Sequence, residues 1–97
     1  MVGLRLDDGD KAYRRPALVL YSRPDCHLCE VAKPLVVEIA RDHGVRVEER
    51  NVEDDARWEA AYGNEIPVAF LGERKLFKYR VDRARLARRL AAALKAD

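Results

Sequence analysis

The 97-residue chain has two cysteines, Cys26 and Cys29, which are separated by His27 and Leu28. A cysteine in the first turn of a helix faces unsatisfied backbone N–H groups and the positive end of the helix dipole, which favour the thiolate. A second cysteine three residues on lies on the same side, within reach of a disulfide. The spacing therefore suits a redox pair in which Cys26 attacks a substrate disulfide and Cys29 then releases the product.

Other interpretations of the pair remain open from the residues alone. The cysteines could be buried and inert, or they could hold an iron–sulfur cluster that bridges two chains. A tetrahedral zinc site needs four ligands. Besides the cysteines, only His27 and His43 are available from Cys and His, and His43 lies at the far end of the expected helix. We therefore expect no metal site within the chain.

The elements around the cysteines place them at a junction. Residues 17–21 form a continuous apolar run, which is typical of a strand buried on both faces. A helical pattern of apolar residues from Leu28 to Ile39 follows, and Gly44 marks its end. Because reactive groups in open α/β sheets gather at the carboxyl ends of strands, this junction is where chemistry is expected.

The rest of the chain supplies the remaining elements of a small α/β domain. Residues 45–52 begin with alternation and predict a second, more exposed strand, while 68–71 and 75–79 predict a hairpin. Asp54 or Asp55 can cap a short helix closed by Gly63, and Asp82 can cap the last helix.

The order β-α-β-α-β-β-α implies an α/β fold with a four-stranded mixed sheet flanked by helices. The first βαβ unit requires parallel strands with a right-handed crossover, and the hairpin adds an antiparallel pair. We expect residues 1–15 to be a loose lead-in and residues 16–97 to form the domain.

Several motifs resemble the glutaredoxins, within the thioredoxin fold. Residues 21–26 are similar to the glutaredoxin segment that leads to the nucleophilic cysteine, with Arg23 at its basic position. Pro34 stands five residues after the second cysteine, and Ile66-Pro67 matches the position of the superfamily's cis-proline. The resemblance implies a dithiol oxidoreductase with catalytic Cys26 and Cys29, which also form its redox disulfide.

The resemblance also implies a substrate-binding surface made by Arg23, Ile66 and Pro67. Arg23 would stabilise the thiolate and bind a substrate carboxylate, although an exposed, merely solubilising arginine is the simpler reading. A cis Pro67 would leave the Ile66 backbone free to pair with a bound peptide as an extra strand. His27 could be cationic near the thiolate or point into solvent.

Two departures from the family patterns concern partners. Glutaredoxins carry a glycine pair after the hairpin, where the γ-glutamyl end of glutathione is held, whereas residues 76–82 here contain no glycine. The tryptophan that precedes the first cysteine in thioredoxins is Asp25. We expect no resident cofactor, and glutathione as a candidate reductant that is held only weakly. The expected partners are protein or small-molecule disulfides and a reductase.

Composition excludes several other classes of protein. The chain is 48% hydrophobic and 37% charged, which is too apolar for a disordered segment. No apolar run approaches the roughly 20 residues that span a bilayer, and the first residues do not resemble a signal peptide, so we expect a cytoplasmic protein. We also expect it to be a monomer.

The formal charge of +2 hides an asymmetry, because residues 74–97 carry nine basic and two acidic residues. These cations read most simply as the solvated face of the last helix, without a stacking platform for nucleic acid. A non-catalytic thioredoxin-fold module that carries a metal or cluster, or docks a protein partner, is the alternative to an enzyme.

Overall fold

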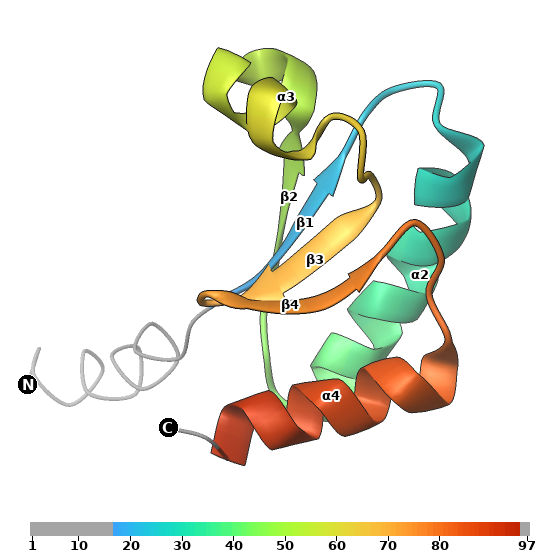
Figure 1. Ribbon diagram of the computed structural model, residues 1–97. Coiled ribbons are helices and arrows are strands. Elements are labelled where there is room, and N and C mark those ends of the chain that lie inside the picture. Colours follow the sequence, from blue (N-terminus) through green and yellow to red (C-terminus); the bar gives the residue numbers. More distant parts are fainter. Residues whose placement is uncertain (1–16, 96–97) are drawn as a thin grey trace, which may run out of the picture.

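The computed structural model describes residues 17–95, so the expected lead-in over 1–15 lies outside the described residues. The expected fold class and element order are confirmed (Figure 1), with one added 3-10 turn. In chain order the elements are β1 (Leu18–Ser22), α2 (His27–Asp42), β2 (Val47–Asn51), η1 (Val52–Asp54), α3 (Ala56–Tyr62), β3 (Val68–Leu71), β4 (Arg74–Lys78) and α4 (Arg83–Lys95).

The four strands form one mixed sheet in the order β2-β1-β3-β4. β1 pairs with β2 in parallel, whereas β3 is antiparallel to both of its neighbours. Tyr21 lies opposite Val68, which in turn lies opposite Lys78. The carboxyl ends of β1, β2 and β4 therefore meet the start of β3 at one edge of the sheet, which we call the cysteine edge.

The two faces of β1 contact different layers, as the continuous apolar run predicts. Leu18 and Leu20 are fully buried in the larger core, together with residues of α2 and α4. Val19 and Tyr21 belong to a smaller cluster with aromatic residues of α3. Helices thus lie on both sides of the sheet, and α2 crosses α4 on one of them (Figure 1).

Polar caps define where the helices begin and end. Asp55 is the N-cap of α3, and its side chain accepts a hydrogen bond from the Arg57 amide. Asp82 accepts the Arg85 amide at 2.8 Å and so caps α4, as expected. α2 ends at Asp42 with His43 as its C-cap, and Gly44 follows with φ of 69°, a left-handed conformation that favours glycine. Among the residues that the structure describes, no helix has the length and apolarity to cross a bilayer.

β2 is shorter at both ends than the expected strand over 45–52, since it begins at Val47 and the added turn, η1, takes up Val52. Asn51 ends β2, and its side chain accepts a hydrogen bond from the Glu53 amide at 2.9 Å. This side-chain cap competes with continued strand pairing, because Asn readily hydrogen-bonds to nearby backbone. Val52 is fully buried even though it lies in the turn. The apolar pattern therefore continued past the point where the strand stops.

Candidate active site

Cys26 and Cys29 lie at the start of α2 and are joined by a disulfide. Cys26 is the N-cap residue rather than a residue of the first turn, and its Sγ accepts a hydrogen bond from the Cys29 amide at 3.2 Å. The Cα atoms are 5.2 Å apart, as a native disulfide requires. The pair thus occupies the junction that the sequence predicts.

The two sulfurs differ in accessibility. Cys29 is 5% exposed and is packed within the helix, whereas Cys26 is partly exposed at its tip. Asp25 and His27, on either side of Cys26, are exposed to solvent. A reagent can therefore approach Cys26 directly, and the N-cap position gives its thiolate a backbone donor and the positive end of the helix dipole.

Arg23 lies on the other side of the loop from the helix, among carboxylates. Its guanidinium donates to Glu59 at 2.8 Å and to the Gly63 carbonyl at 3.3 Å, and lies 3.5 Å from Glu53. The hydrogen bond from Arg23 lowers the pKa of the Glu59 carboxyl. These contacts join the loop before Cys26 to η1 and α3. The proposed role of Arg23 toward a thiolate or a substrate stays a prediction.

Ile66 and Pro67 lie at the cysteine edge, directly before β3. Their peptide bond is cis, as the family resemblance implied, and Pro67 is fully buried. The Pro67 carbonyl accepts the Tyr79 amide at 2.8 Å. Within residues 17–95 the Ile66 backbone makes no hydrogen bond, so its donor and acceptor are available to an added strand. Substrate docking at this position stays a prediction.

Tyr79 occupies the loop where glutaredoxins carry glycines. Its φ is 68° and its side chain is 44% exposed. A left-handed backbone is unusual for a bulky residue and costs about 1–2 kcal/mol relative to glycine's freedom there. Asp25, with φ of 62°, adopts the same conformation before Cys26. Neither conformation was predicted, although Asp tolerates a left-handed backbone better than most residues and so gives a weak signal at position 25.

The sequence did not predict a polar cluster beside the cysteine loop, which is made by Ser22, Glu49 and Lys33. Ser22, which is buried at the end of β1, donates to Glu49 of β2 at 3.0 Å, and Lys33 of α2 lies 2.8 Å from the same carboxylate. The hydrogen bond from Lys33 lowers the pKa of Glu49. A hollow of about 350 Å³ with polar walls, including Arg23 and Asp54, adjoins this group. The βαβ pattern implies parallel pairing of β1 with β2, but not the register, in which Ser22 lies opposite Asn51 and so comes near Glu49.

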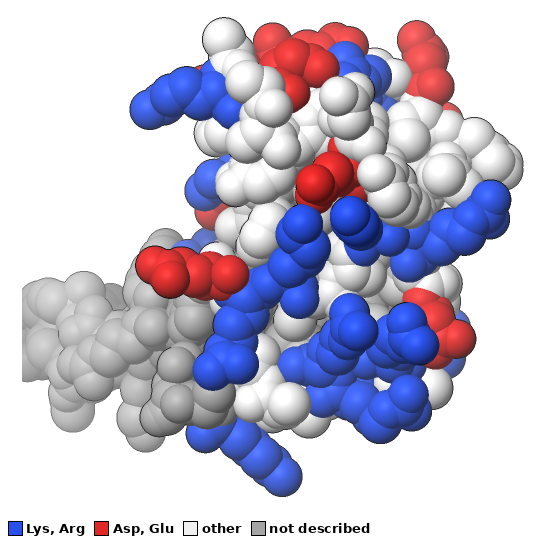
Figure 2. Space-filling view, viewed as in Figure 1, with Lys and Arg blue, Asp and Glu red and all other residues white. Residues whose placement is uncertain are grey.

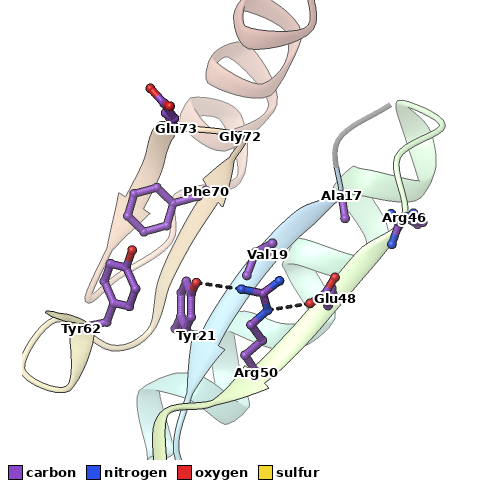
Figure 3. A pocket seen from close by; sticks show the side chains of 10 residues that line it. All are labelled: Ala17, Val19, Tyr21, Arg46, Glu48, Arg50, Tyr62, Phe70, Gly72 and Glu73. Carbon is purple, nitrogen blue, oxygen red and sulfur yellow. Dashed lines mark hydrogen bonds and ion pairs between the residues drawn. The ribbon is translucent and has the colours of Figure 1, made fainter. Parts of the chain in front are cut away.

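Aromatic residues fill the α3 side of the sheet and stand apart from the cysteines. Tyr21 stacks on Tyr62 with ring centroids 4.2 Å apart and meets Trp58 edge-on at 5.9 Å, so these rings pack against one another. Arg50 lies against Tyr21 and donates to its hydroxyl at 3.1 Å (Figure 3). Because α3 is short, a hollow of about 530 Å³ remains beyond it, near Val19.

The histidines do not complete a metal site around the sulfurs. The ring of His43 lies at the other end of α2, where its Nδ1 is 2.9 Å from the Ile39 carbonyl. In the described part of the chain, no three side chains of His, Cys, Asp or Glu converge on one point.

Comparison with known proteins places this arrangement in a family. The family described as Glutaredoxin-like domain (DUF836) matches residues 17–91, from the start of β1 into α4. The chain belongs to this glutaredoxin-like family. None of the curated proteins compared with it matches.

Solved structures agree with that placement. The X-ray structure of the structural genomics target protein XcR50 from X. campestris shares 38% identity and a TM-score of 0.66, over 78% of this chain and 97% of that one. Its solution structure gives 36% identity and a TM-score of 0.63, over 78% and 94% of the two chains. Protein Ne2328 from Nitrosomonas europaea shares 25% identity and a TM-score of 0.64, over 81% and 91%.

Proposed function

We propose that this glutaredoxin-like protein is a cytoplasmic thiol–disulfide oxidoreductase that contributes to redox homeostasis. The observation that carries the proposal is the asymmetry of the pair: Cys26 is partly exposed at the N-cap of α2, while Cys29 is buried one turn later. A pair of this kind supplies an accessible nucleophile and a protected resolving thiol. The family membership supports the same reading.

The reaction transfers two electrons from the dithiol to a disulfide. The Cys26 thiolate attacks one sulfur of the substrate R–S–S–R′, forms the mixed disulfide Cys26–S–S–R, and releases R′S⁻, which takes up a proton. Cys29 loses its proton, and its thiolate attacks the Cys26 sulfur. This step forms the Cys26–Cys29 disulfide and releases RS⁻, which is protonated in turn. The substrate is reduced and the protein is oxidised.

A reductant must return the two electrons before the next cycle. Glutathione or the dithiol of a reductase can do this by the reverse exchange on the Cys26 sulfur. The side chain of Tyr79 stands in the region where glutaredoxins use glycine to approach the γ-glutamyl group, so we expect weak binding of glutathione and efficient turnover only with a protein reductant.

We assign docking of the substrate to residues at the cysteine edge. The free backbone of Ile66, held by the buried Pro67, would pair with an extended segment of the substrate. Arg23 would supply a positive charge beside that segment, shared with Glu59. On the β2 side of the cysteine loop, Ser22 and Lys33 hold the Glu49 carboxylate in place.

The two single-cysteine variants form a matched pair that tests the assignment. Cys26→Ser should abolish single-turnover reduction of hydroxyethyl disulfide, whereas Cys29→Ser should still react and accumulate a mixed disulfide that mass analysis detects. At neutral pH, iodoacetamide should label Cys26 of the reduced wild type before Cys29. A mixed disulfide trapped on Cys29 would reverse the roles. Wild-type protein that does not reduce the disulfide but carries stoichiometric iron would replace the oxidoreductase with a cluster-binding module.

A further inference from the structure

The cations of β4 and α4 are not balanced by acidic neighbours. Residues 74–95 contain nine Lys or Arg and a single acidic residue, Asp82. Lys75 is paired with Glu65 and Arg83 with Glu38, each at 2.8 Å. The other seven cations of this region form no ion pair with any residue between positions 17 and 95, and four of them lie around one hollow: Lys78, Arg80, Arg85 and Arg89. Figure 2 shows Lys and Arg gathered over β4 and α4.

These four residues surround one hollow, and we call them the basic surface. The hollow has a volume of about 200 Å³, and its floor is made by Leu76, Phe77 and Leu86. Arg89 is held over it by a hydrogen bond to the Leu76 carbonyl at 3.0 Å. The carboxylate of Asp82 at its rim is already used as the cap of α4. The hollow therefore presents cations around a small apolar floor.

The basic surface begins at the cysteine edge. Lys78 ends β4 opposite Val68, and the next amide, that of Tyr79, is bonded to the Pro67 carbonyl. β4 is two strands away from β1, which is about 10 Å at the usual strand spacing. An interface of standard size, roughly 800 Å² per partner, extends about 16 Å from its centre. A protein docked at the end of β1, beside the cysteine loop, would thus reach the end of β4, where Lys78 lies.

We propose that the basic surface recognises an acidic protein as the partner in disulfide exchange, one whose disulfide is flanked by carboxylates. The inference rests on the oxidoreductase function proposed above. Arg and Lys around an apolar floor can pair with such carboxylates and speed the encounter by steering, an effect that salt weakens. Acidic side chains gather on the other flank of the cysteine loop, at Glu53, Asp54 and Glu59, so a partner of this charge has one preferred orientation.

The test uses disulfide-bridged peptides that differ only in a flanking run of glutamate, glutamine or lysine. Wild-type protein at low salt should reduce the glutamate peptide about tenfold faster than the glutamine peptide, and the lysine peptide more slowly. The preference should vanish at high salt. The triple variant Lys78→Gln, Arg80→Gln, Arg85→Gln should lose the preference.

The control variant removes the same charge at the opposite end of the molecule. Arg41, Arg74 and Lys95, each changed to Gln, lie at the end of α2, the start of β4 and the end of α4, so this variant should keep the preference. Hydroxyethyl disulfide, which is neutral, should be reduced equally by all three proteins. If the wild type does not reduce it, the oxidoreductase function is wrong.

Other outcomes bear on the surface itself. Normal turnover of hydroxyethyl disulfide without a glutamate preference, or an equal loss of preference in both triple variants, would overturn the recognition of an acidic partner. Binding of a labelled single-stranded oligonucleotide that only the first triple variant loses, with no peptide preference, would also overturn it. The surface would then belong to a nucleic-acid ligand.

Discussion

α3 and α4 flank the cysteine edge, and different forces hold them to the sheet. α3 has no buried residue, and its contacts are the Asp55 cap, the ion pair between Arg23 and Glu59, and half-buried aromatic rings. α4 buries Leu86, Leu90 and Ala93 in the main core. The charged groups of α3 are therefore paired within the molecule, while most of those on α4 are not.

The contrast shows that a helix held in place by buried apolar residues leaves its charged side chains available to partners. A helix anchored by apolar residues needs no ion pairs to stay in place, since burying a leucine stabilises by about 2 kcal/mol whereas an exposed ion pair contributes about 0–1 kcal/mol. On the α3 flank, Arg23 is engaged by two carboxylates even though it occupies the basic position of the family pattern. A cation's place in a motif does not show that it is available to a substrate.

The largest expected difference between the two helices is in stability. Leu90→Ala should lower the free energy of unfolding by about 3 kcal/mol, because Leu90 is fully buried between α4 and the sheet. Trp58→Ala in α3 should cost less, about 1–2 kcal/mol, because the ring is only partly buried. Denaturant unfolding measures both.

Leu90→Met is the control for this prediction, since it keeps the volume and should cost about 1 kcal/mol or less. If Trp58→Ala destabilised the protein as much as Leu90→Ala, the aromatic cluster would be an anchor equal to the main core. The division between a buried and an ion-paired helix would then be wrong.

A smaller effect should separate the two helices at low pH. The hydrogen bonds from the Arg57 side chain and amide lower the pKa of Asp55 to about 2 from its ordinary value of 3.8. The stabilisation by this carboxylate is complete above its unfolded pKa and is lost as pH falls through the folded one. The start of α3 should therefore loosen between about pH 4 and pH 2, while Leu90 in α4 keeps its hydrogen-exchange protection.

NMR titration of the Arg57 amide measures this directly. Its midpoint should lie near pH 2, and Asp55→Asn, which keeps a capping oxygen but no titratable charge, should remove the transition. A midpoint at the ordinary value for an aspartate would show that the contact between Asp55 and Arg57 does not persist in solution.

Local patterns predicted most of the fold, and long-range contacts account for what they missed. The apolar run of β1, the Asp55 and Asp82 caps and the β3–β4 hairpin each depend on residues that are close together in the sequence. Local patterns therefore predicted them. The η1 turn depends on whether Asn51 caps the turn with its side chain or continues the strand pairing. Apolar periodicity does not distinguish these two outcomes.

The candidate site divides in the same way. The cysteine pair and its place at the helix start follow from spacing alone. The pairing of Arg23 with Glu59, 36 residues away, needs the packing of α3 against the loop, which one sequence does not reveal. The left-handed Tyr79 depends on the hydrogen bond of its amide to Pro67, set by two strands meeting at the edge.

The smallest expected effect tests the α4 flank through Tyr79. Glycine adopts a φ of 68° without the cost of about 1–2 kcal/mol that a tyrosine bears, but it loses about 0.5–1 kcal/mol more in chain entropy on folding. Tyr79→Gly should therefore raise the free energy of unfolding by about 0.5 kcal/mol.

Removing the ring also opens the region where glutaredoxins hold glutathione, so formation of the mixed disulfide between glutathione and Cys26 should quicken a few-fold. Arg74→Gly is the matched control: Arg74 lies at the start of β4, away from the cysteine edge and the basic surface, where glycine only weakens the strand. It should lower stability and leave the glutathione rate unchanged. Equal gains in that rate from both substitutions would mean that loosening of the loop, and not removal of the Tyr79 ring, controls access to Cys26.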